Sequence, residues 1–192
     1  MKIDNFMKRW LQNMRLDQYE NGQVLGLIPW IESDDMLSSG FGNISAAGWS
    51  DACIIIPYHL YKQYEDIGFL KDNYEMMKKW IGYVEERCKS NVDSNSKKCE
   101  KYLWNMEFHY GDWLTPSLVN EDGSPNPMLS AKITANQVAT MYFAYSTQLL
   151  SEISNILGKD EESKYYKDLS SNIKLNVLKY SNTIISYDNK YW

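Results

Sequence analysis

Apolar side chains recur every three to four residues along most of this chain. That spacing places them on one face of an α-helix. It predicts a first amphipathic helix whose apolar face holds Phe6, Met7, Trp10, Leu11 and Met14 and which ends at the turn of residues 20–22. Four further helices are predicted at about 51–66, 69–88, 134–158 and 160–178.

Local residues indicate where some of these helices begin and which faces are buried. Ser50 or Asp51 is suited to cap the second helix, and Gly158 to end the fourth. The inward face of the fourth helix is expected to hold Val138, Tyr142, Tyr145, Leu149, Ile153 and Ile156. That of the fifth is expected to hold Tyr165, Leu169, Ile173 and Val177.

Other segments lack helical spacing. Residues 23–48 are rich in glycine and include Pro29, and a long irregular stretch in a compact domain is often functional. Residues 89–101 are polar and predict a surface loop, and 102–127 mix aromatic and turn residues without a clear helix. The end of the chain, 183–192, predicts a short hairpin.

Long helices joined by short turns predict an all-α fold built from antiparallel helical hairpins. Two architectures fit, an α/α toroid and a solenoid of repeats. A solenoid needs at least three copies of a repeat, and no second copy appears at a fixed period in this sequence. The pattern therefore favours part of a toroid, with residues 1–192 forming one unit.

Composition and charge exclude several classes of partner. The formal net charge is −5 and no basic run interleaves with aromatic residues, so a nucleic acid partner is not expected. The longest apolar stretch, 52–57, is too short to span a membrane. The first ten residues, MKIDNFMKRW, lack the apolar segment of a signal peptide, which indicates a cytoplasmic protein.

Cysteine and histidine do not suggest a metal or another cofactor. Cys53, Cys88 and Cys99 lack metal-ligand spacing, and the two histidines, His59 and His109, form no cluster with them in the sequence. Cys88 and Cys99 could pair across the polar loop, but free thiols in a reducing compartment are the simpler interpretation.

Two short segments combine tryptophan with an acidic residue. Trp49 and Asp51 lie in Gly48–Ala52, and Asp112 and Trp113 lie in the segment 110–116. An aromatic face can stack on the apolar face of a sugar while a carboxylate accepts hydrogen bonds from its hydroxyls. Packing tryptophans with a cap and a turn aspartate would give the same local sequence. The acidic stretch 32–35 is best explained as a solvated loop.

The order of these segments resembles the bacterial α-L-rhamnosidases. Residues 48–58 are similar to a family segment of Gly-Trp-Gly-Asp-Ala, an aliphatic run, proline and an aromatic residue, with Ser50 in place of the second glycine. Residues 111–114, Gly-Asp-Trp-Leu, match a later element, and 139–173 resemble the helical hairpin that follows it.

The resemblance implies part of an (α/α)₆ six-hairpin toroid that hydrolyses terminal α-L-rhamnosides with inversion. Trp49 and Trp113 match positions that line the rhamnose pocket, and Asp51 and Asp112 match their acidic neighbours. The family's general acid precedes the helix that residues 6–16 resemble, and its general base lies beyond Trp192. No catalytic residue is therefore expected in this chain.

Two alternatives remain open. The chain could belong to another toroidal carbohydrate enzyme, such as a glucosidase or a uronyl hydrolase, or it could be a helical interaction module without chemistry. A partial toroid would also expose apolar helix faces, which predicts self-association.

Overall fold

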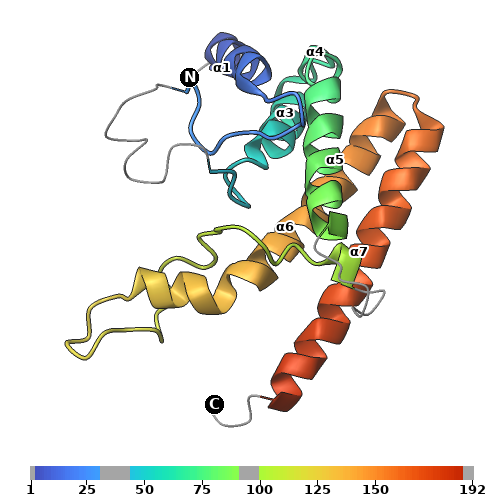
Figure 1. Cartoon of the computed structure of the whole chain (residues 1–192). Helices are drawn as coiled ribbons and strands as arrows, with labels where there is room; N and C mark the ends of the chain where they lie inside the picture. The colour runs from blue at the N-terminus through green and yellow to red at the C-terminus, as the bar shows by residue number, and fades with distance from the viewer. Residues whose placement is uncertain (1–2, 31–43, 91–99, 188–192) are drawn as a thin grey trace.

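The computed structural model describes residues 3–30, 44–90 and 100–187, and the regular elements of these residues are helices (Figure 1). They are α1 (Asp4–Asp17), α3 (Ala52–Tyr64), α4 (Gly68–Lys71), α5 (Tyr74–Ser90), the 3₁₀ turn η1 (Glu100–Tyr102), α6 (Pro127–Ile156) and α7 (Asp160–Tyr187). Extended pairing in these residues is limited to an isolated antiparallel bridge between Val119 and Pro125. The predicted all-α class is confirmed.

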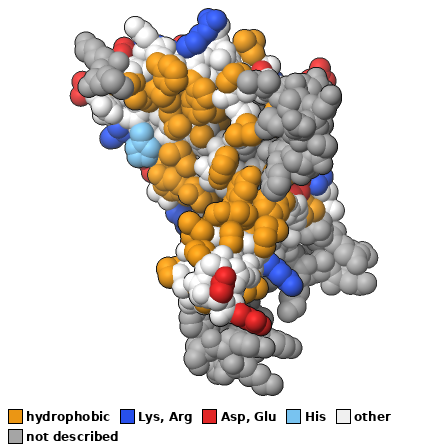
Figure 2. Space-filling view, turned by 90° about the vertical axis from the view of Figure 1, so that its left-hand side faces the viewer, with side chains coloured by type: hydrophobic (Ala, Val, Ile, Leu, Met, Phe, Trp, Pro, Cys, Tyr) orange, Lys and Arg blue, Asp and Glu red, His pale blue; other side chains and the backbone are white. Residues whose placement is uncertain are grey.

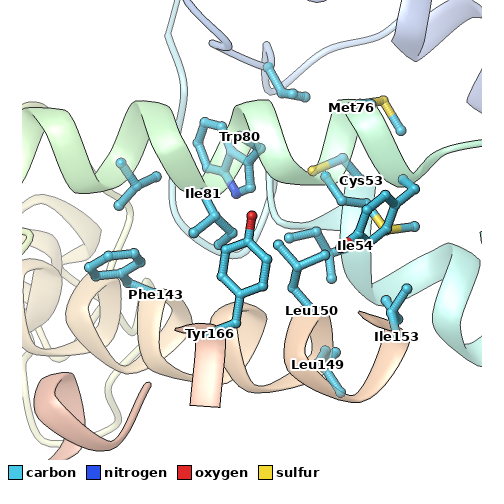
Figure 3. Close-up of a cluster of buried hydrophobic side chains, with 14 of the residues drawn as sticks. Cys53, Ile54, Met76, Trp80, Ile81, Phe143, Leu149, Leu150, Ile153 and Tyr166 are labelled. Atoms are coloured by element: carbon cyan, nitrogen blue, oxygen red, sulfur yellow. The ribbon is translucent and has the colours of Figure 1, made fainter. Parts of the chain in front are cut away.

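The helices pack around one apolar core. α6 and α7 form a long hairpin, α3 and α5 pack against α6, and α1 packs against α3 (Figure 1). The core takes buried side chains from each of these helices, and Figure 3 shows its centre between α3, α5, α6 and α7. Its largest fully buried members include Trp80, Trp104, Phe143, Ile54 and Leu150.

Small hydroxyl residues of α6 are buried and take part in hydrogen bonds. The Thr147 and Ser154 hydroxyls donate to carbonyls one turn earlier, which satisfies them inside the helix. Ser170 of α7 donates to the carbonyl of Ala144, at 2.8 Å, and Ser151 donates to the carbonyl of Ser163, also at 2.8 Å. Polar contacts therefore join the hairpin from one helix to the other.

Several predicted helix boundaries were wrong. α6 begins seven residues before the predicted Thr134, because Pro127 occupies the first turn and the Asn126 side chain accepts a hydrogen bond from the Leu129 amide. The predicted helix 69–88 is divided into α4 and α5. α7 continues to Tyr187, so the hairpin predicted from residue 183 is wrong as far as 187, and 188–192 lie outside the described residues.

Two tyrosines predicted to face inward are exposed. Tyr145 of α6 and Tyr165 of α7 expose 40% and 49% of their surface, whereas Phe143 and Ser146 are buried. Periodicity assigned the large aromatic residues to the core. The packed hairpin instead buries the neighbouring residues Phe143, Ser146 and Tyr166 and leaves the Tyr145 and Tyr165 rings exposed.

The acidic stretch 32–35 and Cys99 lie outside the described residues, while Cys53 and Cys88 are buried free thiols. In the part of the chain that the structure describes, no helix combines the length and apolar character needed to cross a membrane.

Candidate functional site: an aromatic surface before two helices

Three aromatic rings from two distant segments meet at one surface. The Trp49 indole stacks on the Tyr110 ring, with centroids 4.8 Å apart and planes 24° from parallel. Trp113 meets the same Tyr110 ring edge-on, at 5.2 Å and 80°. Trp49, Tyr110 and Trp113 are called the aromatic platform below. The structure thus brings both tryptophans singled out from the sequence to a single tyrosine.

Part of this platform is accessible to solvent. Trp49 exposes 48% of its surface, and Tyr110 and Trp113 are half-buried. The following residue, Leu114, is 59% exposed. Hydrophobic side chains also gather in a band over the face of the molecule shown in Figure 2. Exposed aromatic surface of this kind commonly marks a binding region.

Asp51 lies beneath the platform and is fully buried. One carboxylate oxygen accepts hydrogen bonds from the Ser146 hydroxyl, at 2.6 Å, and the Trp80 indole, at 3.1 Å. The other oxygen accepts from the Gly48 amide, at 2.8 Å. Burial raises the pKa of Asp51, against the opposing effect of these donors. The carboxylate therefore ties the turn that carries Trp49 to α5 and α6.

This placement differs from the roles considered for Asp51 in the sequence. It occupies the cap position of α3, but its side chain makes no capping bond to the helix. Its carboxylate has no exposed surface to offer a sugar hydroxyl in this structure. Ser50, the other candidate cap, is also buried, and its hydroxyl accepts from the Ala46 amide at 3.3 Å.

The turn before α3 is held by its backbone as well. The amides of Trp49 and Ser50 both donate to the Ala46 carbonyl, at 3.1 and 2.9 Å. Gly48 has a φ of +82°, and a β-carbon there would lie 3.1 Å from the Tyr142 ring. A glycine is favoured here because it tolerates both the backbone conformation and the close approach.

The second segment sits on the first half of α6, near Thr134. The Asp112 amide donates to the Thr134 hydroxyl, at 2.8 Å, and this hydroxyl donates to the Ser130 carbonyl. Gly111 has a φ of +61° and passes so close to α6 that a β-carbon would lie 2.9 Å from the Ala135 nitrogen. The Asp112 side chain is exposed beside Trp113. Of the two acidic candidates, Asp112 is thus accessible and Asp51 is not.

His109 lies directly behind the platform and is 2% exposed. Its Nδ1 accepts a hydrogen bond from the Ala47 amide, at 3.1 Å, and its Nε2 lies 3.1 Å from the Met106 carbonyl. The ring also packs edge-on against Trp104, with centroids 4.4 Å apart. Burial lowers the pKa of His109 to about 4, although the charge of Glu107 acts in the opposite direction. The imidazole is therefore neutral near pH 7.

The chemical groups of this site favour recognition over catalysis. Aromatic faces can stack on apolar carbon, and the Asp112 carboxylate can accept hydrogen bonds. Among the described residues, no group of three or more His, Cys, Asp and Glu side chains is placed to hold a metal ion.

Comparison with known proteins agrees with the fold. Residues 1–181 match the model of the bacterial alpha-L-rhamnosidase six-hairpin glycosidase domain. The chain belongs to this family. The six-hairpin toroid predicted from the sequence is the fold of its structural neighbours, so the fold class is confirmed.

Relatives of this six-hairpin glycosidase chain include named α-L-rhamnosidases. One from Formosa agariphila is 29% identical over 171 residues, which are 89% of this chain and 16% of the relative. Another from Streptomyces avermitilis is 28% identical over 174 residues, or 91% of this chain and 14% of that protein. The chain spans about one sixth of the length of these relatives.

Solved rhamnosidase structures share the arrangement of helices. The structure from Dictyoglumus thermophilum has a TM-score of 0.66 and 28% identity, with 93% of this chain and 17% of that chain covered. The Streptomyces avermitilis enzyme, solved with L-rhamnose, has a TM-score of 0.68 and 26% identity, with 92% and 14% covered.

Two members of the site in this six-hairpin glycosidase chain were not among the residues predicted from sequence. Tyr110 belongs to the segment that was singled out, but nothing in its local pattern showed that it would lie between Trp49 and Trp113. The sequence indicates only that His109 belongs to no metal-ligand cluster, and it gives no sign that His109 links two segments. Its role depends on Ala47, a distant residue without a distinguishing side chain.

Proposed function

We propose that this chain supplies part of the sugar-binding wall of an α-L-rhamnosidase that hydrolyses terminal α-L-rhamnosides with inversion. The aromatic platform is the observation that carries the proposal. The family match and the named relatives support the same enzyme class. The relative from Streptomyces avermitilis was solved with L-rhamnose, which supports this sugar as the ligand.

The platform suits a deoxy sugar. L-rhamnose carries a methyl group where most hexoses carry a hydroxymethyl group, so more of its surface is apolar. Trp49 and Trp113 would cover the apolar surface, and the exposed Asp112 carboxylate would accept a hydrogen bond from a ring hydroxyl. The buried Asp51 would act indirectly, by fixing the turn that presents Trp49.

Hydrolysis with inversion requires more than this wall. Two carboxyl groups must stand about 6.5–9.5 Å apart, with room for a water molecule between the second carboxylate and the sugar. Of the two carboxylates next to the tryptophans of the platform, Asp112 is exposed and Asp51 is buried. We therefore assign recognition to this chain and assign the catalytic pair to other parts of the complete enzyme.

A second candidate function, a helical interaction module, rests on the outer face of the hairpin. Met141, Tyr145, Leu175 and Leu178 are each at least 40% exposed on α6 and α7. A shallow groove between these helices is lined mainly by apolar side chains, including Ala144 and Val177. This face supports self-association of the chain, which is compatible with sugar binding elsewhere.

Sugar binding can be tested with saturation-transfer NMR on the isolated chain. We expect L-rhamnose to bind weakly, with a dissociation constant of about 1 mM or higher, since one wall cannot surround the sugar. Trp49→Ala and Trp113→Ala should each weaken binding at least fivefold. Phe6→Ala is the matched control, because Phe6 is an exposed ring on α1 outside the platform.

The outcomes separate the candidate functions. Equal binding of L-rhamnose and D-glucose would favour another toroidal carbohydrate enzyme. No sugar binding, or binding that is insensitive to both tryptophan substitutions, would contradict the proposal. Hydrolysis of an aryl rhamnoside by the isolated chain would contradict the assignment of the catalytic pair to other parts of the enzyme.

A further inference from the structure

The aromatic platform depends on two segments that reach it separately. Trp49 belongs to the turn before α3, and Tyr110 and Trp113 belong to the irregular segment before α6. Contacts between aromatic rings tolerate several geometries, both stacked and edge-on. Ring contacts by themselves therefore do not define how the two segments are aligned.

A buried hydrogen bond joins these segments directly behind the rings. The Ala47 amide donates to Nδ1 of His109, at 3.1 Å. Ala47 lies two residues before Trp49, and His109 immediately precedes Tyr110. A change in this bond would therefore move the Trp49 turn relative to the Tyr110 ring.

The chemistry of His109 suits this position. A neutral imidazole has one nitrogen that accepts a hydrogen bond and one N–H that donates. Because the Ala47 amide must donate to Nδ1, the ring proton is on Nε2, where it can donate to the Met106 carbonyl. Trp104 packs on the ring edge-on and holds its orientation. Each nitrogen has a partner of the matching kind.

We propose that His109 is a positioning residue that aligns Trp49 with Tyr110 and Trp113 for sugar recognition. The inference rests on the proposed function for its biological meaning, but the alignment itself can be measured without a sugar. His109 does not belong to the exposed surface, so its effect on a ligand acts through the rings in front of it.

Two amide variants separate the two hydrogen bonds of His109. The side-chain oxygen of Asn can occupy the place of Nδ1 and accept from the Ala47 amide. The side-chain nitrogen of Gln can occupy the place of Nε2 and donate to the Met106 carbonyl. His109→Asn and His109→Gln both lack the imidazole ring and are both uncharged, as the neutral ring is, so they differ mainly in which bond they retain.

The position of Trp49 can be followed by fluorine NMR of the full chain labelled with 5-fluorotryptophan. Trp49→Phe and Trp113→Phe assign the two resonances, and Tyr110→Leu gives the Trp49 shift without stacking. We expect His109→Asn to keep the Trp49 resonance near its wild-type position. We expect His109→Gln to move it most of the way to the unstacked reference and to reduce L-rhamnose saturation transfer at least threefold.

Each result either supports the proposal or overturns it. The same Trp49 shift in His109→Asn and His109→Gln would overturn it, whether or not that shift matches the wild type. Loss of helical circular dichroism in both variants would also overturn it, because His109 would then be needed for folding in general. If the resonances respond as expected but the wild type does not bind L-rhamnose, the alignment role stands and the proposed function fails.

Discussion

The Trp49 indole stacks on the Tyr110 ring at 4.8 Å, although the two residues belong to segments separated along the chain by the helices α3, α4 and α5. Trp113 completes the surface by meeting Tyr110 edge-on. The stack depends on buried polar groups behind it, among them Asp51 and His109. The contributions of Asp51 and His109 to the stability of the fold can be tested separately from sugar binding.

Replacement of Asp51 by Ala should strongly destabilise the fold. The substitution leaves the buried donors of Trp80, Ser146 and Gly48 without their acceptor, and we expect a loss of about 3 kcal/mol in the free energy of unfolding. Asp112→Ala is the control, because its side chain is exposed, and it should change stability by no more than about 0.5 kcal/mol. Urea denaturation of both variants measures the difference, and equal losses would contradict the buried-anchor role of Asp51.

Replacement of Gly111 by Ala should disturb the contact of the Trp113 segment with α6. The new β-carbon would collide with Thr134 and Ala135 and would also occupy a backbone conformation with positive φ, at an expected cost of about 3 kcal/mol. Gly123 also has a positive φ, +82°, but it has open space around it. Gly123→Ala should therefore cost about 1 kcal/mol. Thermal or urea unfolding measures both variants. Similar losses in the free energy of unfolding for Gly111→Ala and Gly123→Ala would show that the close approach at Gly111 is unimportant.

The neutral state of buried His109 predicts how stability depends on pH. Its pKa is about 4 in the folded chain and about 6.5 in an ordinary exposed histidine, so the unfolded chain binds the proton more readily. His109 therefore contributes stability that is fully present above about pH 6.5 and is lost as the pH falls toward 4. The expected loss in the free energy of unfolding over this pH range is on the order of 3 kcal/mol.

The difference between the wild type and His109→Asn isolates this effect, because Asp51 and the other carboxyl groups titrate in both proteins. Urea unfolding between pH 7 and pH 4 should show that the free energy of unfolding falls more steeply with decreasing pH in the wild type than in His109→Asn. His59→Gln provides the control for replacing an exposed histidine. If the free energy of unfolding depends on pH in the same way in the wild type and in His109→Asn, the result would contradict a neutral, buried His109.

The apolar face of the α6–α7 hairpin predicts concentration-dependent association. We expect the molecular mass in solution to rise above 22.5 kDa as the protein is concentrated. Met141→Glu combined with Leu178→Glu should restore the monomer, because both side chains are exposed on this face. Phe6→Glu is the control and should not restore the monomer, because Phe6 lies on α1. Analytical ultracentrifugation tests this, and a wild-type monomer at all concentrations would contradict the prediction.

The sequence by itself determined the fold class and the approximate positions of the helices. Helical spacing of residues such as Leu11, Leu149, Ile153 and Ile173 reflects the burial of one helix face, and all four side chains are buried. The sequence also identified Trp49 and Trp113 by their acidic neighbours and by resemblance to one family. These features are local, or depend on order along the chain, so they can be recognised without coordinates.

Only the tertiary structure decided which of these residues meet and which are accessible. Asp51 and Asp112 each lie close to a tryptophan in the sequence, yet packing against Trp80 and Ser146 buries Asp51 and leaves Asp112 exposed. Likewise, the bond between His109 and Ala47 depends on a backbone amide that every residue except proline possesses. Such contacts are fixed by the arrangement of whole helices, because that arrangement determines which distant backbone and side-chain groups lie within hydrogen-bonding distance.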